Sequence, residues 1–167
     1  MNFQRIKELQ KIAVKVRMGI IEGVHSAKAG HPGGSLSCTD ILTYLYFEKM
    51  NINPAVPKMP ERDRFVLSKG HAAPALYSVL AHRGFFDIEM LTSLRQIGSI
   101  LQGHPDMKHI PGVDMSSGSL GQGISCAVGM ALSAKHFNEK YKVYSVLGDG
   151  EIEEGQVWEA AMFAANK

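Results

Sequence analysis

Several features that would assign a chain of 167 residues to a specialised class are missing from this sequence. No apolar run approaches the ~20 residues that a membrane-spanning helix needs, and the N-terminus lacks the apolar core of a signal peptide. The net charge of +2 is too small to indicate a surface for nucleic acid or membrane. There is no internal repeat and no low-complexity segment. We therefore expect no membrane and no nucleic acid among the partners.

Cysteine is also scarce. Cys38 and Cys126 lie far apart and fit no CxxC pattern, so they predict buried thiols of a cytoplasmic protein. Glycine is more informative, because many of the 17 glycines stand beside His, Ser or Asp. That pattern is typical of loops in which the backbone approaches a ligand. Hydrophobic residues make up 45% of the chain, which is enough to build a core.

Apolar periodicity and chain breakers predict the main elements. Apolar residues recur at helical spacing from Phe3 to Ser26, which predicts one long amphipathic helix. Two short apolar segments, Arg64–Leu67 and Val143–Leu147, are bounded by turn signals and predict buried strands. The region from Gly98 to Gly118 is expected to be a loop. The further expected helices run from about Leu36 or Thr39 to Met50, Pro74 to Gly84, Asp87 to Ile97, Leu120 to Asn138, and Glu151 to Lys167.

The order of these elements predicts the α/β class with a parallel sheet. Two strands cannot cover the apolar faces of this many helices, and the sequence ends in an expected helix with no strand after it. We therefore expect the first part of a larger doubly wound domain, helix-rich and incomplete.

The segment Gly148-Asp-Gly150 directly follows the second expected strand. In open α/β sheets ligands bind beyond the carboxyl ends of the strands, where a helix N-terminus offers free N–H groups to an anion. Asp149 would add a carboxylate oxygen, which suits a magnesium or calcium ion bridging to a diphosphate. A plain strand-to-helix turn with Asp149 as its N-cap explains the same residues.

A Gly-His pair occurs three times, at His31, His71 and His104. Imidazoles on rigid loops can donate to phosphates, orient hydroxyls or move protons near neutral pH. One alternative is a zinc site of three histidines, although no short ligand spacing such as HxxxH is present. The other alternative is three unrelated loop histidines.

Two further segments allow more than one interpretation. Ser116 to Gly123 is rich in Gly and Ser and opens a helix of small residues, so it can cradle phosphate oxygens with backbone N–H groups or simply pack closely. It is neither a Walker A loop nor a dinucleotide fingerprint. The acidic residues Glu151, Glu153 and Glu154 suit the first turn of a helix because of its dipole. One of the three could instead be a buried carboxylate that tunes a cofactor nitrogen or relays a proton.

Together these segments resemble the N-terminal, diphosphate-binding part of transketolase. The resemblance runs along nearly the whole chain, and although each motif alone is weak, their order and spacing make the set specific. It implies thiamine diphosphate with Mg²⁺ or Ca²⁺ as cofactors, and transfer of a two-carbon ketol unit between sugar-phosphate substrates. The segments that carry it are Ala29–Ser35, Leu67–Ala72, Gln102–Pro105, Pro111–Val113, Gly118–Ile124 and Gly148–Gly155.

The resemblance implies catalytic roles for four residues. His31, His71 and His104 are similar to the active-site histidines of the family, which contact substrate and cofactor and stabilise charge as the donor ketose is cleaved. Glu154 is similar to the carboxylate that couples two cofactors across the family's dimer interface.

The resemblance also implies a set of cofactor-binding residues, of which His71 is one. Gly118 and Leu120 would lie against the diphosphate and the aminopyrimidine. Asp149 would be the first metal ligand, and Gly150 would give a backbone contact to the diphosphate.

Other parts of the family's site are not found in residues 1–167. The family's motif continues to an Asn that also binds the metal, and Asn166 comes too early to be that ligand. A later histidine, the pyrimidine-binding domain and the C-terminal domain are absent. The resemblance therefore implies a partial diphosphate-binding domain that is inactive alone. It would act with a pyrimidine-domain chain or a missing C-terminal part, in a dimer or heterotetramer.

Two alternatives remain open for the function. One is another thiamine-diphosphate ketol transferase with a different acceptor. The other is a non-catalytic interaction protein that keeps the first half of the fold.

Overall fold

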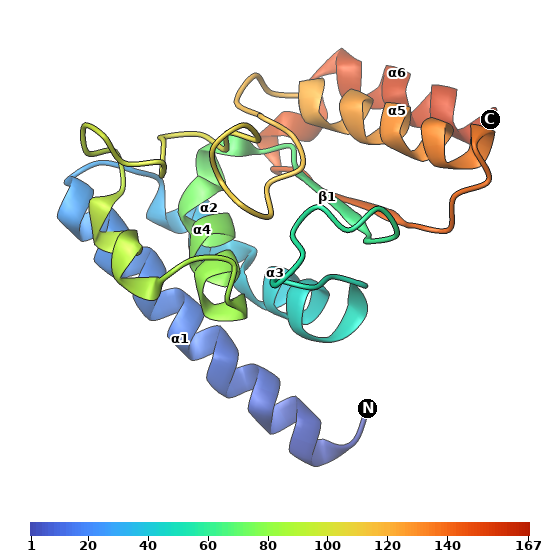
Figure 1. The fold of residues 1–167 in the computed structure, drawn as a ribbon. Coiled ribbons are helices and arrows are strands. Elements are labelled where there is room, and N and C mark those ends of the chain that lie inside the picture. The colour runs from blue at the N-terminus through green and yellow to red at the C-terminus, as the bar shows by residue number, and fades with distance from the viewer.

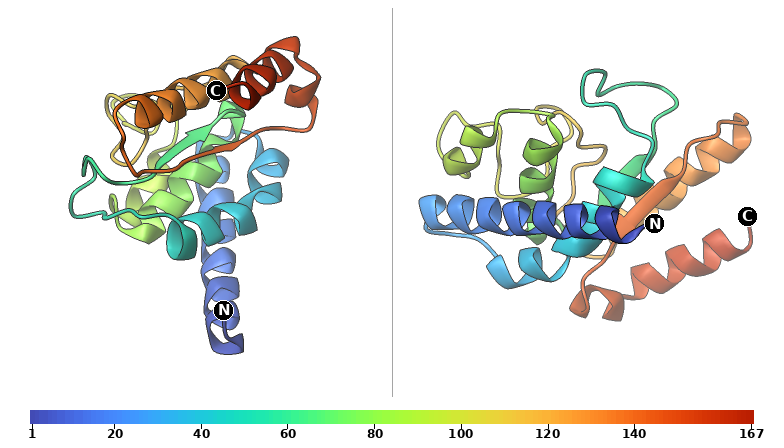
Figure 2. Two further views of the ribbon diagram at one scale, coloured as in Figure 1. Left: turned by 90° about the vertical axis from the view of Figure 1, so that its right-hand side faces the viewer. Right: turned by 90° about the horizontal axis from the view of Figure 1, so that it is seen from below.

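The computed structural model describes all 167 residues and places helices on both faces of a two-stranded parallel sheet (Figure 1). Strands β1 (Arg64–Leu67) and β2 (Val143–Val146) pair in parallel over their whole length. Helices α1 (Phe3–Ala27) and α4 (Ala73–Arg83) lie on one side, while α5 (Gln122–His136) covers the other (Figure 2). The predicted α/β class with a parallel sheet is confirmed.

Helix α1 matches the predicted range to within one residue. The Asn2 side chain caps it by accepting from the N–H of Arg5 at 2.8 Å, and Lys28 ends it in the left-handed conformation. Val16 and Ile20 are fully buried, and α1 packs against α4. The N-terminal turns project beyond the rest of the molecule (Figure 2). Strand β1 and helix α4 also match their predicted ranges closely.

The helix expected from Leu36 or Thr39 to Met50 is divided into α3 (Thr39–Tyr44) and a π-helical turn, η1 (Leu45–Lys49). A further short helix, α2 (Pro32–Ser37), precedes them in the Gly- and Pro-rich segment, where no helix was expected. The π turn brings Leu45, Tyr46 and Met50 together on the buried side, where Tyr46 packs edge-on against Phe65. Core packing thus overrides the regular helix predicted from periodicity.

The helix expected after Asp87 is wrong in type and length. Only a 3₁₀ segment forms, η3 (Ile88–Ser93), and the Asp87 side chain makes no capping hydrogen bond. Leu91 and Leu94 are buried, and a Cβ on Gly23 of α1 would come within 3.0 Å of the Leu91 carbonyl oxygen. The segment therefore lies directly on α1.

The last predicted helix is interrupted. A short 3₁₀ turn, η4 (Gly150–Glu153), comes first, Glu154 is extended, and α6 (Gly155–Ala165) begins only after it. The preceding helix also starts later than expected, since α5 begins at Gln122. An anion near Gly150 would therefore meet a 3₁₀ turn and not the first turn of a long helix.

The hydrophobic core lies on the side of the sheet covered by α1 and α4. The opposite side of the sheet is less covered, as the half-burial of every residue of β2 shows. Helix α6 on that side packs along α5. Helix α6 exposes Trp158, Met162 and Phe163. No helix of the structure has both the length and the apolar character needed to cross a membrane.

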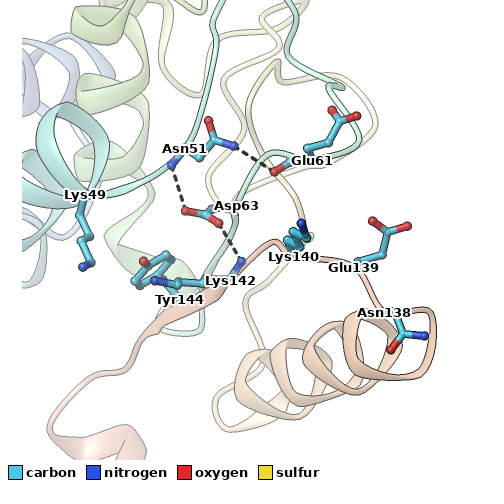
Figure 3. A pocket seen from close by; sticks show the side chains of 9 residues that line it. All are labelled: Lys49, Asn51, Glu61, Asp63, Asn138, Glu139, Lys140, Lys142 and Tyr144. Atoms are coloured by element: carbon cyan, nitrogen blue, oxygen red, sulfur yellow. Dashed lines mark hydrogen bonds between the residues drawn. The ribbon is translucent and has the colours of Figure 1, made fainter.

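The N-terminal ends of the strands are held by a buried carboxylate. Asp63 accepts from the N–H of Asn51 at 2.9 Å and from that of Lys142 at 2.7 Å (Figure 3). Beside it lies a hollow of about 580 Å³ with side chains of both charges. Both carboxylate oxygens of Asp63 already accept from backbone N–H groups, and the sequence motifs lie at the other end of the strands. We therefore do not take this hollow as the candidate functional site.

Candidate functional site

The candidate site is built around the chain that leaves β1, from Ser68 to His71. Gly70 is needed here because its backbone touches another loop. A Cβ on Gly70 would lie 2.7 Å from the backbone N of Gly118 and 2.7 Å from the carbonyl carbon of Ser117. The 3₁₀ turn η2 (Gly70–Ala72) therefore packs directly against the loop before α5, at Ser117 and Gly118.

The three predicted histidines gather around this junction. The rings of His31 and His71 are 5.3 Å apart, edge to face. The ring of His104 lies 3.2 Å from where a Cβ of Gly118 would be. Burial lowers the pKa of His71, and the neighbouring His31 and Lys69 lower it further. Burial, followed by the charges of Arg95 and His31, lowers the pKa of His104. Both imidazoles are therefore neutral near pH 7.

A buried tyrosine on α4 holds the loop that carries His104. The Tyr77 hydroxyl lies 2.8 Å from the carbonyl oxygens of both Gln102 and His104. Burial raises the pKa of Tyr77, so the hydroxyl keeps its proton and remains a donor.

Replacing His31 with Gln is expected to raise the pKa of both His71 and His104, and more at His71, because a positive charge at His31 opposes their protonation. NMR titration of the imidazole resonances measures this. The matched control is His136→Gln at the far end of α5, and unchanged titration of both histidines in H31Q would contradict the arrangement.

Because folding lowers the pKa values of His71 and His104 below the ordinary 6.5, the stability of the fold is expected to fall as pH drops through these lowered values.

The Asp149 side chain is free in this structure. It makes no hydrogen bond or ion pair, and although Asp149 stands at the N-cap position of the η4 turn, its side chain makes no capping hydrogen bond. The backbone N–H groups of Asp149 and Gly150 also have no partner within the protein, and nothing lies within 4 Å of a Cβ position on Gly150. Asp149 borders a hollow of about 490 Å³ that includes Gly34 and Lys69.

Lys69 is a functional candidate that the motifs did not single out. It is only 6% exposed, and its ammonium donates to the carbonyl of Gly34 at 2.7 Å and to the Ser37 hydroxyl at 3.3 Å. No carboxylate lies within ion-pair distance of it. A buried cation without a carboxylate partner attracts an anion into the neighbouring hollow.

The Gly- and Ser-rich segment packs closely at one end and has backbone N–H groups without a protein partner at the other. Gly123 packs closely, because a Cβ there would lie 2.6 Å from the Cα of Ser68. By contrast, Gly118, Ser119 and Leu120 have backbone N–H groups without any partner in the protein. These three groups are available to an anion, and Leu120 itself is exposed.

The three glutamates have different environments. Glu151 is 2% exposed and accepts hydrogen bonds, whereas Glu153 and Glu154 are exposed. Glu154 stands beside Gly121, whose Cβ position would lie 3.3 Å from the Glu154 Cβ. The structure therefore places Glu154 near the segment that carries Leu120. The sequence contained no signal that would single out Glu151 as the buried one.

The donors present fit a diphosphate with a divalent cation. Five backbone N–H groups and the ammonium of Lys69 are available to an anion, and the unpaired carboxylate of Asp149 is available to a cation. No group of three or more His, Cys, Asp or Glu side chains is arranged to hold a metal ion, so nothing in the geometry favours a three-histidine zinc site.

Residues 8–167 match the family described as "Transketolase, thiamine diphosphate binding domain". Among solved structures, the transketolase of Leishmania mexicana superposes on 93% of this chain with a TM-score of 0.89 and 33% sequence identity. The superposed part is 25% of that chain.

Two curated relatives share nearly half of their aligned residues with this chain. The "6-deoxy-6-sulfo-D-fructose transketolase subunit SqwG" of Clostridium sp. (strain MSTE9) is 49% identical over the whole chain, which spans 60% of that protein. A subunit of the apulose-4-phosphate transketolase of Phocaeicola vulgatus is 47% identical over 95% of the chain and 56% of that protein. The chain thus spans little more than half the length of these relatives.

Proposed function

We propose a function that starts from the family to which this chain belongs, the transketolase thiamine diphosphate binding domain family. On this premise, the chain is the N-terminal part of an enzyme that transfers a two-carbon ketol unit from a ketose phosphate to an aldose phosphate. Thiamine diphosphate is the cofactor of this family. When bound, it supplies the reactive carbon and the electron sink for breaking a carbon–carbon bond. The protein supplies binding, orientation and charge.

One observation carries the proposal for this chain. Two loops with unpaired N–H groups and a free carboxylate meet at the carboxyl ends of β1 and β2, where α/β folds bind their ligands. We propose that Gly118 to Leu120 and Gly150 donate to the diphosphate. Asp149 would hold a magnesium or calcium ion against it, and Lys69 would add a positive charge.

The histidines are proposed to act on the substrate side of the site. His31, His71 and His104 surround one junction, and the neutral imidazoles of His71 and His104 can each donate one hydrogen bond and accept another. They would orient the hydroxyls of a ketose and move protons as its bond is cleaved. Glu154 is proposed to couple this cofactor to a second one across an interface.

A partner is part of the proposal. The two curated relatives are named as subunits, and both are longer than this chain. We propose that residues 1–167 are a partial diphosphate-binding domain and work with a pyrimidine-domain chain or a C-terminal continuation, in a dimer or heterotetramer in the cytoplasm. The isolated 167 residues would then have no transketolase activity. Turnover of a ketose phosphate by the isolated chain would contradict this.

Titration with thiamine diphosphate and Mg²⁺ tests the function through the single tryptophan. The Trp158 indole N–H donates to the Ile152 carbonyl at 2.8 Å, so its fluorescence depends on the η4 turn beside Asp149. We expect a saturable fluorescence change in the native protein with its partner, and none when EDTA removes the metal. Thiamine without its diphosphate is the matched control ligand.

The same titration separates an enzyme from a non-catalytic interaction protein. Such a protein would use the exposed apolar face of α6, with Trp158 and Met162, for a partner alone. A flat fluorescence response in the presence of a pyrimidine-domain partner would favour that function. Assays with phosphorylated and non-phosphorylated acceptors would then distinguish a transketolase from a related ketol transferase.

A further inference from the structure

Glu151 is the most deeply buried carboxylate near the candidate site, with 2% of the residue exposed. It lies in η4, and both of its oxygens accept hydrogen bonds. Oε1 accepts from the Ser68 hydroxyl at 2.5 Å and from the Gly121 N–H at 2.9 Å. Oε2 accepts from the Gly148 N–H at 2.9 Å. A buried carboxylate requires such donors, and this one is well supplied.

The three donors belong to segments that are distant in the sequence. Ser68 follows β1 and lies 83 residues before Glu151, while Gly121 lies 30 residues before it, at the start of α5. Gly148 is the first residue of the Gly-Asp-Gly loop. Ser68 also accepts from the N–H of Ile124 at 3.1 Å, which joins the first turn of α5 to the same point. One side chain thus connects the end of the sheet to both loops of the candidate site.

Each of the two loops carries unpaired N–H groups next to the residue that Glu151 binds. Gly118, Ser119 and Leu120 immediately precede Gly121, and Asp149 and Gly150 immediately follow Gly148. The relative position of these two sets of donors therefore depends on the hydrogen bonds to Glu151. Gly121 is itself in a left-handed conformation with φ of 79°, and the bond from its N–H to Glu151 holds the chain in that turn.

We propose that Glu151 is a positioning residue of the diphosphate site, which fixes the two sets of free N–H donors relative to one another. This inference rests on the proposed function, because it assumes that the donors receive a diphosphate. Glu151 does not bind the cation itself, since its oxygens are already occupied by protein donors, unlike those of Asp149. The role is preorganisation of the site before the ligand arrives.

Positioning and charge predict opposite results for Glu151→Gln. A negative charge near a diphosphate repels it, so removal of the charge alone would tighten anion binding. Glutamine, however, has only one oxygen acceptor. If that oxygen faces Ser68 and Gly121, the amide NH₂ faces the Gly148 N–H and two donors oppose each other. Positioning therefore predicts weaker anion binding and a loosened Gly-Asp-Gly loop.

The experiment uses the native protein with its partner chain, and it has two readouts. Calorimetry with inorganic pyrophosphate and Mg²⁺ is expected to show about tenfold weaker binding by Glu151→Gln, equal to ~1.4 kcal/mol. Hydrogen exchange without ligand is expected to be faster at the Gly148 N–H, with a smaller change at Gly121. The matched control is Glu153→Gln, which removes the same charge from an exposed position in the same turn; it should bind pyrophosphate no more weakly than the unsubstituted protein and leave the exchange at Gly148 unchanged.

The outcomes separate this inference from the proposed function. Failure of the unsubstituted protein to bind pyrophosphate would overturn the proposed function and the role of Glu151 with it. Equal or tighter binding by E151Q would overturn only the role of Glu151. If E151Q does not fold, Ser68→Ala decides the question, because it removes one donor to Glu151 and is expected to weaken pyrophosphate binding. Unchanged binding by S68A would then overturn the inference.

Discussion

Asp149→Asn is expected to abolish most of the metal-dependent cofactor affinity while leaving the fold intact. The Asp149 carboxylate makes no hydrogen bond or ion pair in the protein, so folding does not depend on its charge. A cation between this carboxylate and a diphosphate would lose a charged oxygen ligand. Changes to residues that only orient a metal ligand already cost ~10–100-fold in metal affinity, so the loss of a direct ligand should cost about 100-fold or more. Calorimetry with thiamine diphosphate at several Mg²⁺ concentrations measures the loss.

The control for Asp149→Asn is Asp87→Asn. Asp87 is also exposed, lies before a 3₁₀ turn and makes no capping hydrogen bond. The Asp87→Asn variant should bind the cofactor like the unsubstituted protein. Both variants should keep the melting temperature of the unsubstituted protein. Normal Mg²⁺-dependent affinity in the Asp149 variant would show that the cation is held elsewhere. The proposed role of Asp149 would then be wrong, while the fold and the family would stand.

Gly70→Ala is expected to cause a large loss of stability at the site. The added Cβ would lie 2.7 Å from the backbone N of Gly118, and a backbone atom cannot swing aside as a side chain can. Overpacking of this kind costs about 2 kcal/mol, which corresponds to a melting temperature lower by about 4–8 °C in a chain of this size. The Gly118 loop must move from His104, so the ring resonances of His104 should shift as well. Calorimetric melting and NMR test the two effects.

Gly129→Ala is the matched control for this crowding effect. Gly129 is exposed in the middle of α5, and no atom lies within 4 Å of its Cβ position. Alanine there should stabilise the helix by up to ~1 kcal/mol, because glycine is a poor helix former. If both variants melt at the same temperature, the backbone contact between Gly70 and Gly118 is not as close as the structure has it.

Where local sequence determines the elements, the predictions agree with the structure. Helix α1 has an Asn cap, helical apolar spacing and a Gly- and Pro-rich segment after it, so its bounds could be predicted within one residue. Strand β1 was predicted at its observed residues because a short segment with three consecutive apolar residues stands between turn signals. The parallel sheet follows from strands separated by helices.

The errors occur where packing between distant segments sets the backbone. The π turn at Leu45–Lys49 turns residues toward Phe65, which no local pattern reveals. The segment after Asp87 lies against Gly23 of α1, and the contact replaces a helix with a 3₁₀ turn. Burial of Glu151 turns the start of the last helix inward, and the chain becomes extended at Glu154 before α6 begins.

The sequence alone determined which residues are the candidates for the chemistry, because Gly-His, Gly-Asp-Gly and Gly/Ser-rich segments are local patterns of backbone freedom and polar side chains. It also determined the class of fold through periodicity. Only the tertiary structure decided which of three adjacent glutamates is buried and that Lys69 has no carboxylate partner. Those facts depend on segments up to 83 residues apart. Burial and hydrogen bonding between distant segments are set by the folded chain as a whole, and no local window of sequence contains them.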